Sequence, residues 1–187
     1  MKRKLPTIGF IGTGIIGLPM AFNLIKNNYN IYAYVRNIKN HRNVKKTGCL
    51  IINDLTEFYE KIDILILAVS DTKDVEEILV GTNGLIKFSK TPKIVIDMST
   101  ICPIETISMS KNLSKFKISL IDAPVSGGEI GAIKGNLSIM VGGKKNKVNK
   151  VMPILKILGE KITHIGESGS GQVTKACNQL ILSLIHI

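Results

Sequence analysis

A glycine turn near the start of the chain has the spacing of a dinucleotide-binding site. Gly12, Gly14 and Gly17 follow the apolar run Ile8–Ile11 and precede a helical pattern. Gly12 can adopt the angles of a tight turn, Gly14 has no Cβ to block a pyrophosphate, and Gly17 lets the helix approach the strand. The free N–H groups of that helix favour an anion. We expect the cofactor to contact Gly12, Thr13, Gly14, Ile15, Ile16 and Gly17.

The residues after the second apolar run bear on which dinucleotide binds. An acidic residue at this place would accept hydrogen bonds from the ribose of NAD, but the sequence reads Tyr34-Val35-Arg36-Asn37. Arg36 comes about 20 residues after the glycines and can pair with a 2′-phosphate. We therefore expect Arg36 and Asn37 to contact NADP. NAD remains possible, and an ordinary surface arginine is the simpler alternative.

Five short apolar runs separated by helical patterns predict an α/β fold. Strands that alternate with helices form a mostly parallel, doubly wound sheet of the Rossmann type, with helices on both faces. Ligands of such sheets bind beyond the carboxyl ends of the strands, so Val69 is placed to pack on the cofactor. The expected strands are Ile8–Ile11, Ile31–Val35, Ile62–Val69, Ile94–Met98 and Leu120–Ala123, and the expected helices include Leu18–Asn27 and Pro103–Leu113.

Length and charge limit the classes of function. A chain of 187 residues suffices for one domain and is short for two. The net charge of +11 would suit nucleic acid if the basic residues formed a stripe, but they do not, and Lys, Asn and Ile are abundant throughout, as an AT-rich gene would make them. We expect no nucleic-acid partner, although the charge can attract anionic ligands.

Other motifs are missing from the sequence. There is no apolar run long enough to span a membrane and no signal peptide, so we expect a cytoplasmic protein without membrane contact. The three cysteines show no paired spacing and the three histidines no ligand spacing, so we expect neither a disulfide framework nor a metal site.

The last residues form a helical pattern that starts at about Gly171 and becomes apolar on nearly every side. A helix of this kind has to be buried, yet the chain stops at Ile187. We expect either a truncated chain or a partner that covers the helix.

Three further segments, together with the glycine turn, resemble the β-hydroxyacid dehydrogenases. The segments are Asp97–Pro103 (DMSTICP), Asp122–Gly128 (DAPVSGG) and Gly169–Gln179 (GSGQVTKACNQ). Their order and spacing match that family along the whole chain, and their wording is most similar to its tartronate semialdehyde reductase branch. The resemblance implies NADP-dependent reduction of a small aldehyde acid, first of all 2-hydroxy-3-oxopropionate to glycerate. Alternatives are a 3-hydroxyisobutyrate or 4-hydroxybutyrate dehydrogenase, and a non-catalytic nucleotide-binding module.

The resemblance also implies roles for single residues. Lys175 would donate the proton to the developing alkoxide, because a partly desolvated ammonium both stabilises an oxyanion and releases a proton. Asn178 would share its helix face and orient the substrate. The family contacts the substrate carboxylate and the nicotinamide ribose at positions that correspond here to Ser126, Gly127, Gly128 and Thr100.

Family members continue into a helical second domain, which also forms the dimer. We therefore expect residues 1–165 to form an NAD(P)-binding Rossmann domain and residues 166–187 to begin the interdomain catalytic helix. The resemblance implies a homo-oligomer for the full-length protein and weak or no turnover for this piece alone.

Overall fold

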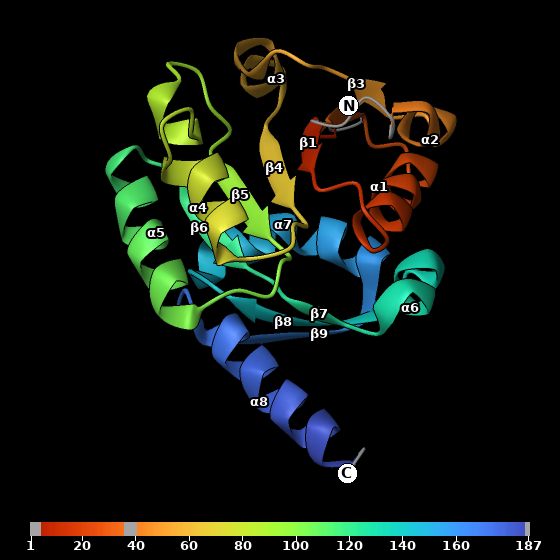
Figure 1. The fold of residues 1–187 in the computed structure, drawn as a ribbon, viewed down its shortest axis with the longest axis vertical. Helices are drawn as coiled ribbons and strands as arrows, with labels where there is room; N and C mark the ends of the chain where they lie inside the picture. Colours follow the sequence, from red (N-terminus) through yellow and green to blue (C-terminus); the bar gives the residue numbers. More distant parts are fainter. Residues whose placement is uncertain (1–4, 36–40, 186–187) are drawn as a thin grey trace.

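The computed structural model describes residues 5–35 and 41–185, which fold around one mixed sheet (Figure 1). The strand order is β3-β2-β1-β4-β5-β6-β8-β7, and β9 also pairs with β8. The strands are β1 (Ile8–Ile11), β2 (Ile31–Tyr34), β3 (Leu50–Ile51), β4 (Ile64–Leu67), β5 (Ile94–Asp97), β6 (Ser119–Asp122), β7 (Val125–Ser126), β8 (Leu137–Gly142) and β9 (Gly159–Gly166).

Helices connect most of these strands. They are α1 (Gly17–Lys26), α2 (His41–Lys46), α3 (Leu55–Lys61), α4 (Thr72–Val80), α5 (Pro103–Lys115), α6 (Gly128–Lys134), α7 (Lys145–Leu158) and α8 (Ser170–Ile185), with a short 3-10 turn η2 (Leu85–Lys87) before β5.

The six strands from β3 to β6 in the sheet order run parallel to one another, which confirms the predicted doubly wound sheet. Strands β1, β4 and β5 are buried along their whole length, as continuous apolar runs predict for a sheet covered on both faces. The five expected strands correspond to β1, β2, β4, β5 and β6, and their ends differ from the observed ones by at most two residues. Because β1 lies between β2 and β4, its carboxyl end is the switch point at which such sheets bind ligands.

The two-residue strand β3 and the last three strands were not expected from the sequence. β8 runs antiparallel to β6 and β7, and β9 runs parallel to β8. β7 has only two residues, and β9 has mostly exposed or half-buried residues, so neither forms an apolar run. Helix α7 lies between β8 and β9 in the sequence and contains Pro153, which obscures its helical pattern.

Two apolar cores cover the two faces of the sheet. One face packs against α1, α6 and α7 and the other against α3, α4 and α5. In Figure 1, α1 and α6 lie to the right of β4, and α5 lies to its left. Side chains that anchor the first core are Met20, Leu24, Ala132, Val151 and Leu155, and those that anchor the second are Phe58, Val75, Leu79, Met109 and Leu113.

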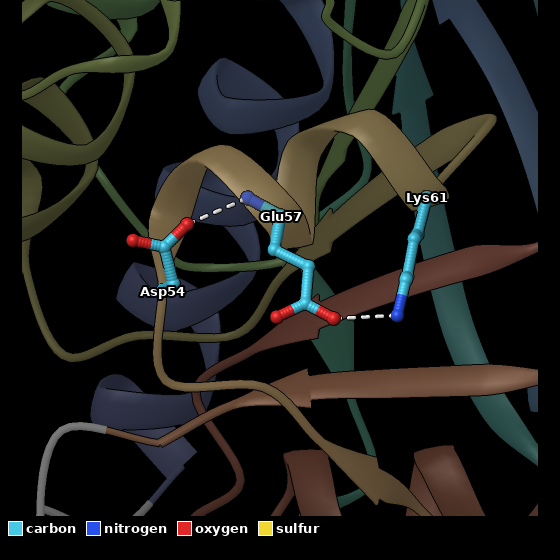
Figure 2. Close-up of polar contacts among 3 residues, drawn as sticks. All are labelled: Asp54, Glu57 and Lys61. Atoms are coloured by element: carbon cyan, nitrogen blue, oxygen red, sulfur yellow. Dashed lines mark hydrogen bonds and ion pairs between the residues drawn. The ribbon is translucent and has the colours of Figure 1, made fainter.

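Local sequence signals begin the short helix α3. The Asp54 carboxylate accepts a hydrogen bond from the Glu57 N–H at 2.7 Å and thereby caps the first turn. Glu57 pairs in turn with Lys61, one turn further on, at 2.5 Å (Figure 2). This helix carries Phe58 and Tyr59 into the second core.

Helix α8 follows the sheet and points away from it toward the end of the chain (Figure 1). Its first turns bury Gln172 and Lys175, whereas its last turns expose apolar side chains such as Leu180 and Leu184. None of the helices within the described residues is long and apolar enough to cross a membrane.

Candidate active site

A cavity of about 650 Å³ lies beyond the carboxyl ends of the parallel strands. Its walls come from segments that are far apart in the sequence: the glycine turn, the ends of β4 and β5, the segment around β7, and helix α8. The lining residues are Gly14–Gly17, Ala68–Ser70, Met98–Thr100, Val125–Gly128, Lys175, Gln179 and Leu182.

The three glycines of the turn differ in the space around them. A Cβ on Gly12 would run into the backbone oxygen of Ala68, and its φ of +98° already favours glycine. A Cβ on Gly17 would run into the carbonyl oxygen of Gly12. Gly14, by contrast, has no atom within 4 Å of a Cβ position and faces open space. Gly12 and Gly17 are therefore needed for the fold, whereas Gly14 leaves room for a ligand.

A smaller cavity of about 250 Å³ lies on the other side of the same turn. Gly12, Thr13 and Gly14 line it together with Tyr34 and Val35 at the end of β2. Gly14, Ala68, Val69 and Ser70 line both cavities, so the two form the halves of one extended site. Arg36 and Asn37, which were expected to contact the cofactor, lie outside the described residues.

Among the described residues that line the large cavity, Lys175 is the one with a charged side chain. It lies in the second turn of α8 and is only 7% exposed. Burial lowers the pKa of its ammonium below the ordinary value of 10.5. A buried amine with a lowered pKa is a better proton donor than a solvated lysine, and its charge attracts an anionic substrate.

Gln179, rather than Asn178, shares the cavity with Lys175. The Lys175 Nζ donates a hydrogen bond to the Gln179 Oε1 at 2.8 Å. Asn178 does not line the cavity, and its Nδ2 donates to that same oxygen at 3.3 Å. Asn178 and Gln179 follow Lys175 by three and four positions and both lie near its face of the helix, but Gln179 is the one that lines the cavity.

Backbone and hydroxyl groups line the wall opposite the turn. Ser126 ends β7, and Gly127 and Gly128 follow it with φ of +134° and +60°, angles that glycine adopts easily. Thr100, which is exposed, follows β5 and also lines the cavity. Except for Asn178 and the undescribed pair, the structure places every predicted site residue at one of the two cavities.

Two buried carboxyl groups lie behind this wall. Asp97 and Asp122 end β5 and β6 and are paired in register. Burial raises the pKa of Asp97 to about 7, and the neighbouring Asp122 adds to the effect. Its Oδ1 accepts from the Ser99 N–H at 3.0 Å, whereas its Oδ2 finds no hydrogen-bond partner in the described part of the chain. Burial also raises the pKa of Asp122, although the hydrogen bonds that its carboxylate accepts from backbone N–H groups act in the opposite direction.

Within the described ranges, no three His, Cys, Asp or Glu side chains gather where they could hold a metal ion. Of the cysteines, Cys49 is buried, whereas Cys102 and Cys177 are exposed, and all three are free thiols.

Comparison with known proteins shows to which family this chain belongs. Residues 7–166 match the family model of the NAD binding domain of 6-phosphogluconate dehydrogenase. The chain belongs to this family. This NAD-binding domain also matches hydroxyacid dehydrogenases, which confirms the resemblance to them.

Three relatives illustrate the match. The domain is 40% identical to the 2-hydroxy-3-oxopropionate reductase of Escherichia coli over 95% of this chain and 60% of the relative. It is 35% identical to the mitochondrial 3-hydroxyisobutyrate dehydrogenase of Rattus norvegicus over 100% of this chain and 56% of the relative. The solved 3-hydroxyisobutyrate dehydrogenase of Mycobacterium tuberculosis with L-serine superposes with a TM-score of 0.88 at 28% identity, over 96% of this chain and 60% of that one. The chain thus spans about 60% of the length of such relatives.

Proposed function

We propose that this chain supplies the cofactor-binding domain and the proton donor of an NADP-dependent reductase of small aldehyde acids. The first candidate reaction is the reduction of 2-hydroxy-3-oxopropionate to glycerate, which the name of the Escherichia coli relative describes. The observation that carries the proposal is the cavity that joins the glycine turn, Thr100, Ser126–Gly128 and the buried Lys175.

The residues of the turn fit a dinucleotide. The open space at Gly14 leaves room for a pyrophosphate, and the cavities on either side of the turn suit the two halves of the cofactor. We assign the smaller cavity, at the end of β2, to the adenosine half, because Arg36 follows that strand directly in the sequence. When bound, NADPH supplies the hydride that the carbonyl carbon accepts.

The chain's own groups then handle the proton and the carboxylate. As the carbonyl oxygen becomes an alkoxide, the Lys175 ammonium donates a proton to it and is left as a neutral amine, which solvent reprotonates. Gln179 holds the amine in place through its 2.8 Å hydrogen bond. Ser126 and the N–H groups of Gly127 and Gly128 bind the substrate carboxylate, because a hydroxyl and free backbone amides are suitable donors for it.

A second candidate is the oxidation of 3-hydroxyisobutyrate, the same chemistry in reverse on a similar acid. It is supported by the match of the rat 3-hydroxyisobutyrate dehydrogenase over the full length of this chain. A purely binding role is disfavoured by the buried lysine in the cavity, because burying an ammonium costs stability and a binding module has no need of a proton donor there.

A nucleotide titration tests the cofactor assignment. We expect NADPH to bind more tightly than NADH when nicotinamide fluorescence is followed, and Arg36→Ala to weaken NADPH roughly 10-fold by removing a charge-assisted pair with the 2′-phosphate. Arg42→Ala, six residues further along, is the matched control. Binding of neither nucleotide would refute the assignment, and an equal effect of Arg36→Ala on both would refute the NADP preference.

A further inference from the structure

The side chain of Gln172 bridges two walls of the cavity. Gln172 lies in the first turn of α8 and is 1% exposed. Its Oε1 accepts a hydrogen bond from the Ile101 N–H at 3.1 Å, and its Nε2 donates to the Ser99 carbonyl at 2.8 Å. The amide therefore holds the backbone on both sides of Thr100. An apolar side chain would fill the same space without joining α8 to the residues after β5.

The backbone of the same helical turn is fastened to a third strand. The Asp122 carboxylate at the end of β6 accepts from the Gly169 N–H at 2.7 Å and from the Gln172 N–H at 3.1 Å. Because these N–H groups begin α8, the carboxylate acts as its cap from 50 residues away in the sequence. The start of the helix has little freedom to slide along the sheet.

The segment held by Gln172 is itself tied to β4. The Ser99 Oγ accepts a hydrogen bond from the Val69 N–H at 3.0 Å, and both residues line the cavity. Lys175 follows Gln172 by three positions, so one turn of helix connects the bridge to the buried ammonium. The network thus sets the position of Lys175 relative to Thr100.

We propose that Gln172 is a positioning residue that locks residues 99–101 onto helix α8 and so fixes the separation of Thr100 and Lys175 across the cavity. Its effect on turnover rests on the proposed function, whereas the locking itself does not. A misplacement of a catalytic group by about 1 Å can cost about 100-fold in rate, so the lock has a large effect without touching substrate.

The test replaces Gln172 with methionine, which has a similar length and forms neither hydrogen bond. Thr174→Val is the matched control, since it removes a hydrogen bond within the same helix, from the Thr174 Oγ1 to the Ser170 carbonyl at 2.9 Å. The pKa of Lys175 is measured by competitive acetylation over a pH series with mass spectrometry, which requires neither cofactor nor substrate.

In Gln172→Met we expect the loosened helix to admit water and the pKa of Lys175 to rise toward 10.5, with no change in Thr174→Val. In the full-length protein, turnover should fall roughly 10- to 100-fold while KM for NADPH stays constant. If the pKa of Lys175 shifts but the unaltered full-length protein reduces no aldehyde acid, the lock stands and the proposed function fails. If neither the pKa nor turnover departs from the control, or if KM for NADPH rises as much as turnover falls, the positioning role is refuted.

Amide hydrogen exchange in the unaltered chain decides the question if Gln172→Met does not fold. The lock requires the N–H groups of Ile101 and Gln172 to exchange with similar protection, because one opening event releases both. Exchange of Ile101 at the rate of an exposed loop amide, with Gln172 protected, would refute the lock.

Discussion

At the scale of single residues, the site depends on one buried amine. Lys175 is held by Gln179 in a cavity without another charged side chain among its described lining residues. Burial lowers the pKa of this amine, so the protonated form is lost at a lower pH than in an exposed lysine. The proposed reduction needs the protonated form, so its rate should depend on pH.

In the full-length protein, we expect Lys175→Met to lower the turnover of 2-hydroxy-3-oxopropionate by about 10²- to 10⁴-fold, the usual contribution of a general acid. In the unaltered protein the rate should decline as pH rises through the pKa of Lys175, below 10.5. Steady-state kinetics over a pH series measure both effects. Lys111→Met, at an exposed position of α5, is the control and should keep full turnover. Equal rates in the two variants would remove Lys175 from the mechanism.

The glycine turn offers a second prediction for single residues. Gly14→Ala should reduce NADPH affinity at least roughly 10-fold, because the new methyl group occupies the space meant for the phosphates, while the free energy of unfolding stays almost unchanged. Gly12→Ala should instead destabilise the fold, since its Cβ meets the Ala68 carbonyl at a φ of +98°. Nucleotide titration and urea denaturation separate the two effects. A loss of stability in Gly14→Ala equal to that in Gly12→Ala would contradict the distinction.

At the scale of elements, the sequence predicted five of the six strands of the parallel part, all but the two-residue β3, and none of β7, β8 and β9. Buried strands such as β4 and β5 form uninterrupted apolar runs. β7 and β9 do not, because they are short or half-exposed, and their pairing with β8 depends on the rest of the fold.

The same contrast applies to the site. The glycine turn and the motifs that hold Ser126 and Lys175 are local patterns and could be predicted. The bridge from Gln172 to Ser99 and Ile101 joins residues more than 70 positions apart, so no local sequence pattern predicts it. Gln179 lines the cavity and Asn178 does not, because the rotation of the helix, and not the residue type, decides which side chain faces the cavity.

Helix α3 provides a test of a local signal. Asp54→Ala should lower the free energy of unfolding by about 1 kcal/mol, because the Glu57 N–H loses its cap. Urea denaturation measures the change. Asn53→Ala, at the preceding exposed position, is the control and should change stability by less than about 0.5 kcal/mol. Equal effects of the two substitutions would show that the cap contributes nothing.

At the scale of the whole molecule, the carboxyl ends of β5 and β6 lie where the apolar interior of the sheet meets the site. There the fold buries Asp97 and Asp122 side by side instead of apolar residues. Asp122 is compensated by the N–H groups that begin α8, whereas the Asp97 Oδ2 has no partner among the described residues. The free energy of unfolding of the entire domain should therefore depend on whether Asp97 carries a proton.

The direction of this dependence follows from the pKa of Asp97, about 7 in the folded chain against an ordinary value of 3.8. Between these values the folded state binds more protons than the unfolded state, so stability falls as pH rises, by at most about 1.4 kcal/mol per pH unit from this group. Asp97→Asn cannot ionise, so we expect it to gain stability relative to the unaltered chain between pH 4 and pH 7, measured by urea denaturation. Glu160→Gln, at an exposed position of β9, should leave the original slope in place. Parallel curves for Asp97→Asn and the unaltered chain would mean that Asp97 ionises normally inside the fold, and that its burial costs the domain nothing at neutral pH.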